Sequence, residues 1–277
     1  MLRKKKIVLG VTGGIAAYKA AELVRELVRG GAEVFVVMTR SAQAFVTPLT
    51  FQTLSGNRVA TDLFSPLEES EIGHISLADR ADALVIAPAT ANVIGKIAGG
   101  IADDLLTTVV MATKAPVLLA PAMNVNMWEN PICGENIRRL RDRGYRFLEP
   151  ATGELACGYE GKGRLPEVSV IVEEIRALLS PQDLRGEAVL VSAGPTQEPF
   201  DPVRFLSNRS SGKMGYALAR AARRRGARVT LVSGPTALAV PPGVTFLPVR
   251  TALEMEDAVL KNLPAASILI MAAAVSD

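Results

Sequence analysis

The residues best suited to chemistry lie in residues 121–128, which read Pro-Ala-Met-Asn-Val-Asn-Met-Trp and include the only tryptophan of the chain. This stretch follows residues 115–120, a short apolar run that is typical of a buried strand. Open α/β sheets bind ligands at the carboxyl ends of their strands, and the amide of Asn124 suits a carboxylate or amide of a small substrate. A second interpretation stays open, in which Asn124 caps the next helix and the methionines and tryptophan fill a core.

Other expected strands also end in small or polar residues; they are residues 6–11, 33–38 and 83–87. The first runs into Gly13 and Gly14, where a phosphate can approach backbone N–H groups at the start of a helix. The spacing is not G-x-G-x-x-G, so the dinucleotide fingerprint is missing. The second ends in residues 39–41, Thr-Arg-Ser, whose hydroxyls and cation suit a phosphate. The two turns predict a mononucleotide phosphate site, with a plain glycine-rich turn as the alternative.

His74 is the only histidine of the chain, and it follows a glycine where a helix is expected to begin. Histidine exchanges protons near neutral pH, so His74 is a candidate for the same pocket. A structural or surface role is the alternative for this residue.

Residues 153–164 contain four glycines and form a candidate lid. Within them, the thiol of Cys157 is a candidate proton donor, and Lys162 and Arg164 are candidates to hold an anionic substrate. A flexible connector is the alternative interpretation of this segment.

The composition is that of an aliphatic protein with a large core. The chain has 277 residues, of which 49% are apolar and 5% aromatic, and its length favours two domains. With 31 basic and 28 acidic residues the net charge is +3, so we expect no nucleic-acid partner. No segment reaches the roughly 18 apolar residues of a membrane span, and we expect none.

The cysteines and the histidine argue against a disulfide framework or a metal centre. Cys133 and Cys157 form neither a disulfide framework nor a CxxC metal pair, which favours the reducing cytosol. Cys133 starts another expected helix and is interpreted as an ordinary packed cysteine. A single histidine gives no basis for a histidine-based metal site.

Alternating strand-like and helix-like patterns predict two successive α/β domains. An expected helix over residues 165–179 closes the first domain, residues 1–180, and residues 180–186 are typical of a linker. The second domain, residues 187–277, stops directly after an expected strand, so we expect its doubly wound sheet to be incomplete. In the first domain, residues 45–70 are expected to be irregular.

Six motifs together resemble one family, the bifunctional phosphopantothenoylcysteine decarboxylase and phosphopantothenate–cysteine ligase of coenzyme A synthesis. They are GVTGGIAAYK (10–19), GHI (73–75), APATAN (87–92), PAMNVNMW (121–128), ACG (156–158) and DPVRFLSNRSSGKMG (201–215). Each motif alone is weak, but all six in this order are specific. The resemblance covers the whole chain. The resemblance implies a Rossmann-like flavoprotein domain followed by an incomplete second Rossmann-like α/β domain.

The resemblance implies that the first domain binds FMN. The residues it assigns to the phosphate are Gly13, Gly14, Ile15, Thr39 and Ser41. Those it assigns to the flavin are Thr90, Ala91, Asn92, Ala102 and Asp103. Met123 and Asn124 would bind the substrate, together with Lys162 and Arg164 of the candidate lid.

The chemistry of this family gives the catalytic residues their roles. The substrate has no carbonyl β to its carboxylate, so the flavin first oxidises the thiol to a thioaldehyde, CO2 leaves, and the resulting ene-thiol is reduced again. His74 would assist the oxidation, Asn124 would bind the departing carboxylate, and Cys157 would donate the last proton. Sites of this family lie between the subunits of a trimer, so we expect a homo-oligomer built through the first domain.

The second domain resembles the start of the ligase, which activates phosphopantothenate with CTP and Mg2+ or Mn2+ before cysteine attacks. Asn208 matches the residue linked to turnover of the acyl-cytidylate. Residues matching part of the CTP site are Ala272, Ala273, Ala274 and Asp277. The lysine-rich segment of the family would come after this point, so we expect weak or no ligase activity.

Two alternatives stay open beside a cytoplasmic enzyme acting on small molecules. One is a sister flavoprotein, such as a peptidyl-cysteine decarboxylase or a flavin prenyltransferase, although prenyltransferases lack the cysteine-bearing lid and the attached ligase. The other is a non-catalytic, flavin-binding regulatory subunit, which would require a defective site although His74, Asn124 and Cys157 are all in place.

Overall fold

The computed structural model describes residues 2–63, 73–154, 158 and 160–276. The chain separates into two compact units, Met1–Leu179 and Ser180–Asp277. Among the described residues, no helix has the length and apolar character needed to span a bilayer.

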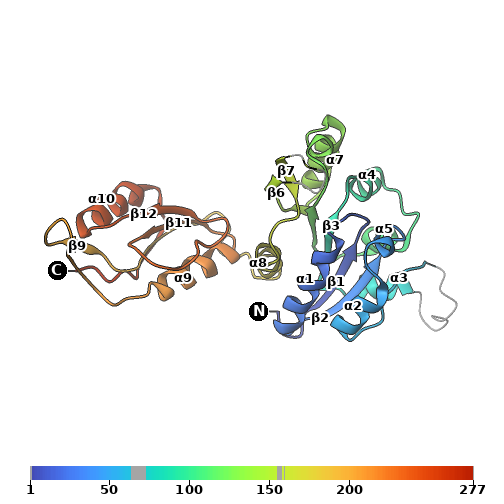
Figure 1. The fold of residues 1–277 in the computed structure, drawn as a ribbon, viewed down its shortest axis with the longest axis horizontal. Coiled ribbons are helices and arrows are strands. Elements are labelled where there is room, and N and C mark those ends of the chain that lie inside the picture. Colours follow the sequence, from blue (N-terminus) through green and yellow to red (C-terminus); the bar gives the residue numbers. More distant parts are fainter. Residues whose placement is uncertain (1, 64–72, 155–157, 159, 277) are drawn as a thin grey trace. The chain divides into compact units, whose positions relative to one another are not determined.

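The first unit is built on a five-stranded parallel sheet (Figure 1). Its strands are β1 (Lys6–Val11), β2 (Glu33–Met38), β3 (Ala83–Ala89), β4 (Val117–Pro121) and β5 (Arg146–Phe147). They stand in the order β2-β1-β3-β4-β5, the order of flavodoxin-like doubly wound sheets. The winding direction reverses at β1, so this topology expects a ligand at the carboxyl ends of β1 and β3.

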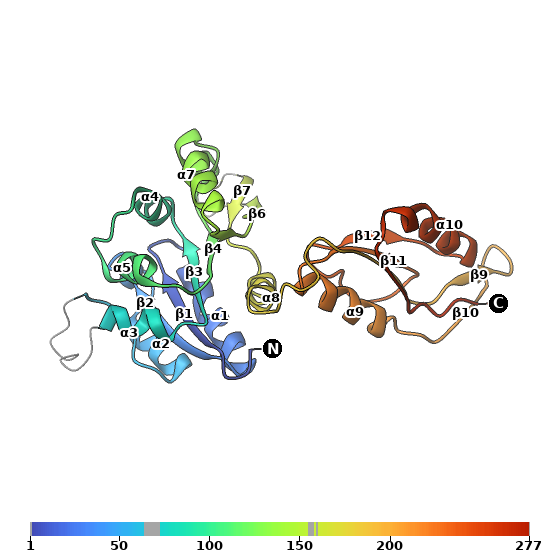
Figure 2. The same ribbon diagram turned by 180° about the vertical axis from the view of Figure 1, so that it is seen from behind.

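Helices cover both faces of this sheet (Figure 2). They are α1 (Ala17–Arg29), α2 (Pro48–Ser55), α3 (Gly73–Arg80), α4 (Ala91–Gly99), α5 (Leu105–Ala112), α6 (Val125–Trp128), α7 (Pro131–Asp142) and α8 (Val168–Leu178), with a 3-10 turn at Ala42–Ala44. Alternation along β1 separates the two layers, because Ile7 and Leu9 join one buried cluster and Val8 joins the other.

One apolar layer lies between the sheet and α1, α2 and α8. The α1 residues Ala20, Leu23, Val24 and Leu27 recur at helical spacing, so a single stripe of this helix is buried. The other layer is formed with α4, α5 and α7, which contribute residues such as Ile94, Leu106 and Ile137. A sheet buried on both faces requires strands that are apolar throughout, and β3 is buried at every position.

The structure corrects the expectation that residues 45–70 are irregular, because α2 occupies Pro48–Ser55. Pro48 stands in the first turn, where a proline costs nothing and favours a helix start. Only Phe51 of this helix is fully buried, so the sequence lacks the repeated apolar positions by which a helix is predicted. Residues 64–72 lie outside the described part of the chain.

Much of the glycine-rich segment expected as a lid is an antiparallel hairpin of β6 (Ala151–Glu154) and β7 (Glu160–Arg164). Cys157, the proposed proton donor, lies outside the described residues. The hairpin strand β7 packs against α6 and the residues that precede it.

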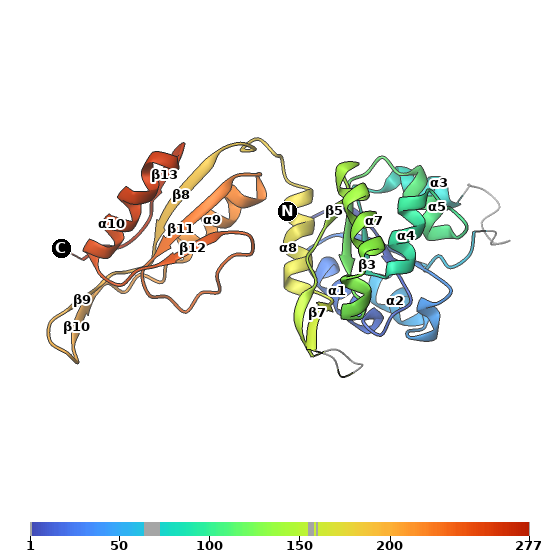
Figure 3. The same ribbon diagram turned by 90° about the horizontal axis from the view of Figure 1, so that it is seen from above.

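The second unit has a four-stranded parallel sheet of order β12-β11-β8-β13 (Figure 3). Its elements are β8 (Ala188–Ala193), β9 (Gln197–Pro199), β10 (Phe205–Ser207), α9 (Lys213–Arg224), β11 (Arg228–Ser233), β12 (Thr245–Pro248), α10 (Ala252–Asn262), a 3-10 turn (Leu263–Ala265) and β13 (Ile268–Met271). α9 and α10 contribute to separate buried clusters, through Tyr216 and Ala219 and through Met255 and Val259. The predicted α/β fold class is confirmed for both units.

Candidate cofactor and substrate site

The turns after β1 and β2 touch at Gly13. A Cβ placed on Gly13 would lie 2.3 Å from the Cβ of Ser41 and 2.9 Å from the carbonyl carbon of Ser41. Only glycine permits so close an approach, so the glycine turn and the turn at residues 39–41 form one surface. The Thr39 hydroxyl accepts a hydrogen bond from Ala42 N–H at 3.3 Å and orders the second turn.

Thr12 joins the ends of β1 and β3. Its fully buried hydroxyl donates to the carbonyl oxygen of Pro88 at 2.7 Å and accepts from the N–H of Thr90 at 3.1 Å. Thr90 in turn caps α4, because its hydroxyl accepts from Val93 N–H at 3.5 Å. The starts of α1 and α4 are thereby held at adjacent strand ends, and helix starts favour negative charge.

These strand ends open on a cavity of about 1500 Å³. Most of the residues predicted for cofactor and substrate line it; they are Gly13, Gly14, Ile15, Thr39, Ser41, Thr90, Ala91, Asn92, Asp103, Met123, Asn124 and Arg164. The described lining does not include Ala102, His74 or Lys162. His74 stands in the first turn of α3 and is half-buried.

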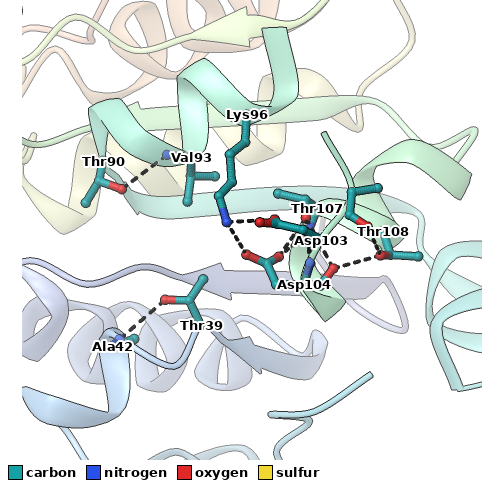
Figure 4. A network of polar contacts seen from close by, with 10 residues as sticks. Thr39, Ala42, Thr90, Val93, Lys96, Asp103, Asp104, Thr107 and Thr108 are labelled. Carbon is teal, nitrogen blue, oxygen red and sulfur yellow. Dashed lines mark hydrogen bonds and ion pairs between the residues drawn. The ribbon is translucent and has the colours of Figure 1, made fainter. Parts of the chain in front are cut away.

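Lys96, Asp103 and Asp104 form a charged group in the cavity wall (Figure 4). The ammonium of Lys96 lies 2.7 Å from Asp103 Oδ1 and 3.3 Å from Asp104 Oδ2, and its hydrogen bond to Asp103 raises the pKa of Lys96. Burial opposes ionisation of Asp104, but hydrogen bonds from Thr107 and Lys96 outweigh it and lower the pKa of Asp104. Asp104 is also the first residue of the capping box of α5.

Lys96 and Asp104 are absent from the sequence prediction. One signal in the sequence pointed to Lys96, because it lies four residues after Asn92 and therefore on the same face of α4. The pairing with Asp103 and Asp104 crosses the turn between two helices, which no periodic pattern reveals.

Asn124 both caps a helix and lies in the cavity lining. Its Oδ1 accepts from Asn126 N–H at 2.8 Å and caps α6, while the residue also lines the cavity. Met123 and Trp128 pack on a buried cluster, as the core interpretation expects, whereas Met127 is exposed. The buried Cys133 has its sulfur 3.7 Å from that of Met123, and burial raises the pKa of the Cys133 thiol, which fits an ordinary packed cysteine.

Lys162 is engaged away from the cavity lining. Its ammonium lies 2.6 Å from Glu149 Oε2 and 5.6 Å from the centroid of the Trp128 ring. Arg164, two residues further along β7, is the cation of this strand that lines the cavity.

In the second unit, glycines bring the ends of β8 and β11 close to the start of α9. A Cβ at Gly215 would lie 2.4 Å from the Cβ of Ala193, so α9 packs tightly on β8. The buried hydroxyl of Ser192 accepts from the N–H groups of Ala272 and Ala273, at 3.2 and 3.3 Å. Ala274 N–H donates to the carbonyl oxygen of Gly194 at 2.8 Å.

Asn208 lies in an exposed turn, where its Oδ1 accepts from Ser210 N–H at 2.9 Å. Asp277 lies outside the described residues. Within the part that the structure describes, no group of three or more His, Cys, Asp or Glu side chains could hold a metal ion.

The sheet order and the cavity at the β1 switch point define the first unit as a flavodoxin-like α/β protein with a ligand-sized cavity at the carboxyl ends of its strands. Residues 1–180 match the Flavoprotein family, and residues 184–277 match the DNA/pantothenate metabolism flavoprotein C-terminal domain. The chain is 53% identical to the Coenzyme A biosynthesis bifunctional protein CoaBC of Bacillus subtilis, over 100% of this chain and 69% of that protein. It belongs to the CoaBC family.

Solved structures resemble the first unit. A cysteine-to-serine variant of PPC decarboxylase, complexed with pantothenoylaminoethenethiol, is 34% identical with a TM-score of 0.56, covering 63% of this chain and 97% of that one. The FMN binding protein AtHal3 is also 34% identical, with a TM-score of 0.55, covering 63% of this chain and 96% of that one.

Proposed function

We propose that the chain is a flavoprotein decarboxylase of coenzyme A synthesis, which converts 4'-phosphopantothenoylcysteine into 4'-phosphopantetheine with FMN. The observation that carries this proposal is the contact of Gly13 with Ser41, which joins two strand-end turns into a phosphate cradle beside Asn124 in one cavity. Membership of the CoaBC family supports the pathway, and the likeness to a PPC decarboxylase supports the reaction.

The residues present fit FMN. The glycine turn, Thr39 and Ser41 offer backbone and hydroxyl donors for one phosphate, and Arg40 adds positive charge to the same lining. Small residues such as Ala91 and Ala122 leave room for a flat ring. When bound, FMN supplies the two-electron oxidation and re-reduction that allow a substrate without a β-carbonyl to lose CO2.

The side chains assigned to the reaction then orient the substrate and move its protons. The amide of Asn124 donates to the carboxylate that departs as CO2, and the guanidinium of Arg164 and the Met123 side chain hold the remainder of the substrate. Cys157 donates the proton that completes the product. His74 accepts a proton during oxidation of the thiol.

His74 does not line the cavity of its own chain, so we propose that it serves the cavity of a neighbouring copy in a homotrimer formed through the first unit. The proposal predicts that mixing His74→Asn chains with Asn124→Asp chains restores part of the activity that each variant lacks. Subunit exchange followed by a CO2 assay measures this, and no recovery in proven mixed oligomers would place both residues in one chain.

For the second unit we propose the ligase part, which joins 4'-phosphopantothenate and cysteine with CTP. Ala272, Ala273 and Ala274 would contact the nucleotide, Asn208 would act in turnover of the acyl-cytidylate, and Asp277 would complete the site. Mg2+ or Mn2+ would enter with the CTP phosphates, as Mg2+ commonly does.

The visible spectrum of the purified protein, recorded before and after adding phosphopantothenoylcysteine while CO2 is measured, tests the decarboxylase. Flavin bands and release of CO2 are the expected result. A colourless protein that FMN cannot reconstitute would contradict the cofactor. A yellow protein without CO2 release would favour a sister enzyme or a regulatory flavin-binding protein.

A further inference from the structure

Glu149 joins neighbouring elements through both of its carboxylate oxygens. Oε1 accepts from Arg141 of α7 at 2.5 Å, and Oε2 accepts from Lys162 of β7 at 2.6 Å. The ammonium of Lys162 also faces the ring of Trp128 in α6, at a distance of 5.6 Å that supports cation–π attraction. One carboxylate therefore ties β7 to α7, and the Lys162 ammonium ties it to α6.

The strand β7 also touches residues 121–128 on both sides of Lys162. Directly after Lys162, the carbonyl oxygen of Gly163 accepts a hydrogen bond from Met123 N–H at 3.0 Å. Directly before Lys162, a Cβ at Gly161 would lie 2.8 Å from Cγ2 of Val125, so the close contact between β7 and Val125 requires glycine. Successive residues of β7 thus meet the stretch that carries Asn124.

We propose that Lys162, Glu149 and Arg141 form a latch that holds β7 against residues 121–128, which makes Lys162 a positioning residue for the decarboxylation. This role rests on the proposed function, because Arg164 on β7 and Asn124 beside α6 line one cavity and would hold one substrate. The latch sets how the two sides of that cavity lie relative to each other.

The charges of the latch give the ammonium of Lys162 a partner within the protein. Its ammonium is already paired with a carboxylate, and that carboxylate is bound by a second cation. The hydrogen bond from Lys162 lowers the pKa of Glu149, which favours the ionised carboxylate that both cations bind. Drawing Lys162 toward a substrate would leave Glu149 with half of its partners.

Hydrogen exchange of the Met123 amide, together with KM and kcat of the holoenzyme, tests the latch. In Lys162→Met and in Glu149→Gln we expect this amide to exchange about two- to fivefold faster, the range expected for loss of a partly exposed ion pair. KM for phosphopantothenoylcysteine should rise by a similar factor while kcat stays near that of the native enzyme. Lys162→Arg should restore both values.

Lys261→Met is the matched control, because Lys261 forms an ion pair of the same 2.6 Å length with Asp257 on the exposed face of α10 in the second unit. Lys261→Met should change neither the exchange rate of the Met123 amide nor KM. A raised KM with unchanged exchange at Met123 would mean that Lys162 contacts the substrate directly, and would overturn the latch, as would no change in either quantity. Faster exchange in Lys162→Met of a protein that never releases CO2 would support the latch and contradict the proposed function.

Discussion

Gly13→Ala tests whether the cofactor cradle depends on the contact between the β1 and β2 turns. The added Cβ would stand 2.3 Å from the Cβ of Ser41 and 2.9 Å from its carbonyl carbon, so backbone has to move. Overpacking of this kind costs about 1–3 kcal/mol. In a unit of this size each kcal/mol lowers Tm by about 2–4 °C, so we expect a decrease of about 2–12 °C.

The overpacking cost of Gly13→Ala can instead weaken cofactor binding. If the turn relaxes away from Ser41 when FMN is absent, Tm changes little, but FMN must then restore the strained geometry. A cost of about 1–3 kcal/mol corresponds to binding that is about 5- to 150-fold weaker. Tm of the FMN-free protein and Kd for FMN must therefore be measured on the same sample.

Fluorescence of Trp128 is a suitable assay for both Tm and Kd for FMN, because Trp128 is the only tryptophan and lies in the first unit. Gly14→Ala is the matched control, since a Cβ there has Thr90 Cγ2 at 3.7 Å as its nearest contact, and Tm without FMN should stay within about 2 °C. Adding Ser41→Gly to Gly13→Ala removes one of the close contacts and should restore part of the loss. A Gly13→Ala protein with native Tm and native FMN affinity would refute the cradle.

Other substitutions separate the proposed roles. Asn124→Asp keeps the oxygen that accepts from Asn126 N–H, so Tm should hold, but carboxylate repulsion should lower kcat/KM for CO2 release by about 100-fold or more; a smaller loss would remove Asn124 from carboxylate binding. His74→Asn should leave the flavin bound but not bleached by substrate under anaerobic conditions, and normal CO2 release would contradict its role. Cys157→Ser should release CO2 and accumulate the ene-thiol, seen by mass spectrometry as a product lacking two hydrogens; reduced product at the native rate would mean another proton donor. The pKa of Asp104 in the folded protein is lowered from the ordinary 3.8, so the stability it contributes is fully present above the ordinary value and is lost as pH falls through the lowered pKa. Asp104→Asn, which can still cap α5, should make Tm less dependent on pH below about pH 5, and a Tm that falls at acid pH as in the native protein would argue against this role of Asp104.

Strands β1 to β4 were readable from the sequence because each is a short apolar run. The predicted ranges 6–11 and 33–38 are the observed β1 and β2. α2 was missed for the opposite reason, because it starts at a proline and buries only Phe51 completely. The position of α2 is set by its packing against α1, which is a tertiary contact and leaves no periodic pattern in the sequence.

The site was readable where adjacent strand ends supply its residues, since parallel strands bring their carboxyl ends to one edge of the sheet. The site could not be predicted where a charged side chain pairs with a residue on another element of the fold. The charge and the glycine-rich surroundings of Lys162 make it a candidate substrate ligand, whereas its ammonium pairs with Glu149, which precedes the hairpin, in the structure. A sequence shows that a cation is present and does not show which carboxylate it meets.

Asn124 shows how one residue can satisfy a structural and a chemical requirement together. Capping α6 needs only an acceptor for Asn126 N–H, and Asp, Ser or Thr would serve as well. Among these caps, only asparagine adds the N–H2 donors that a carboxylate needs. The cap fixes the side chain in the cavity wall, and in the proposed function the donors give that position its chemistry. Asn124→Asp changes the second property and keeps the first, so loss of CO2 release at native Tm would assign the asparagine to chemistry, and native activity would assign it to the cap alone.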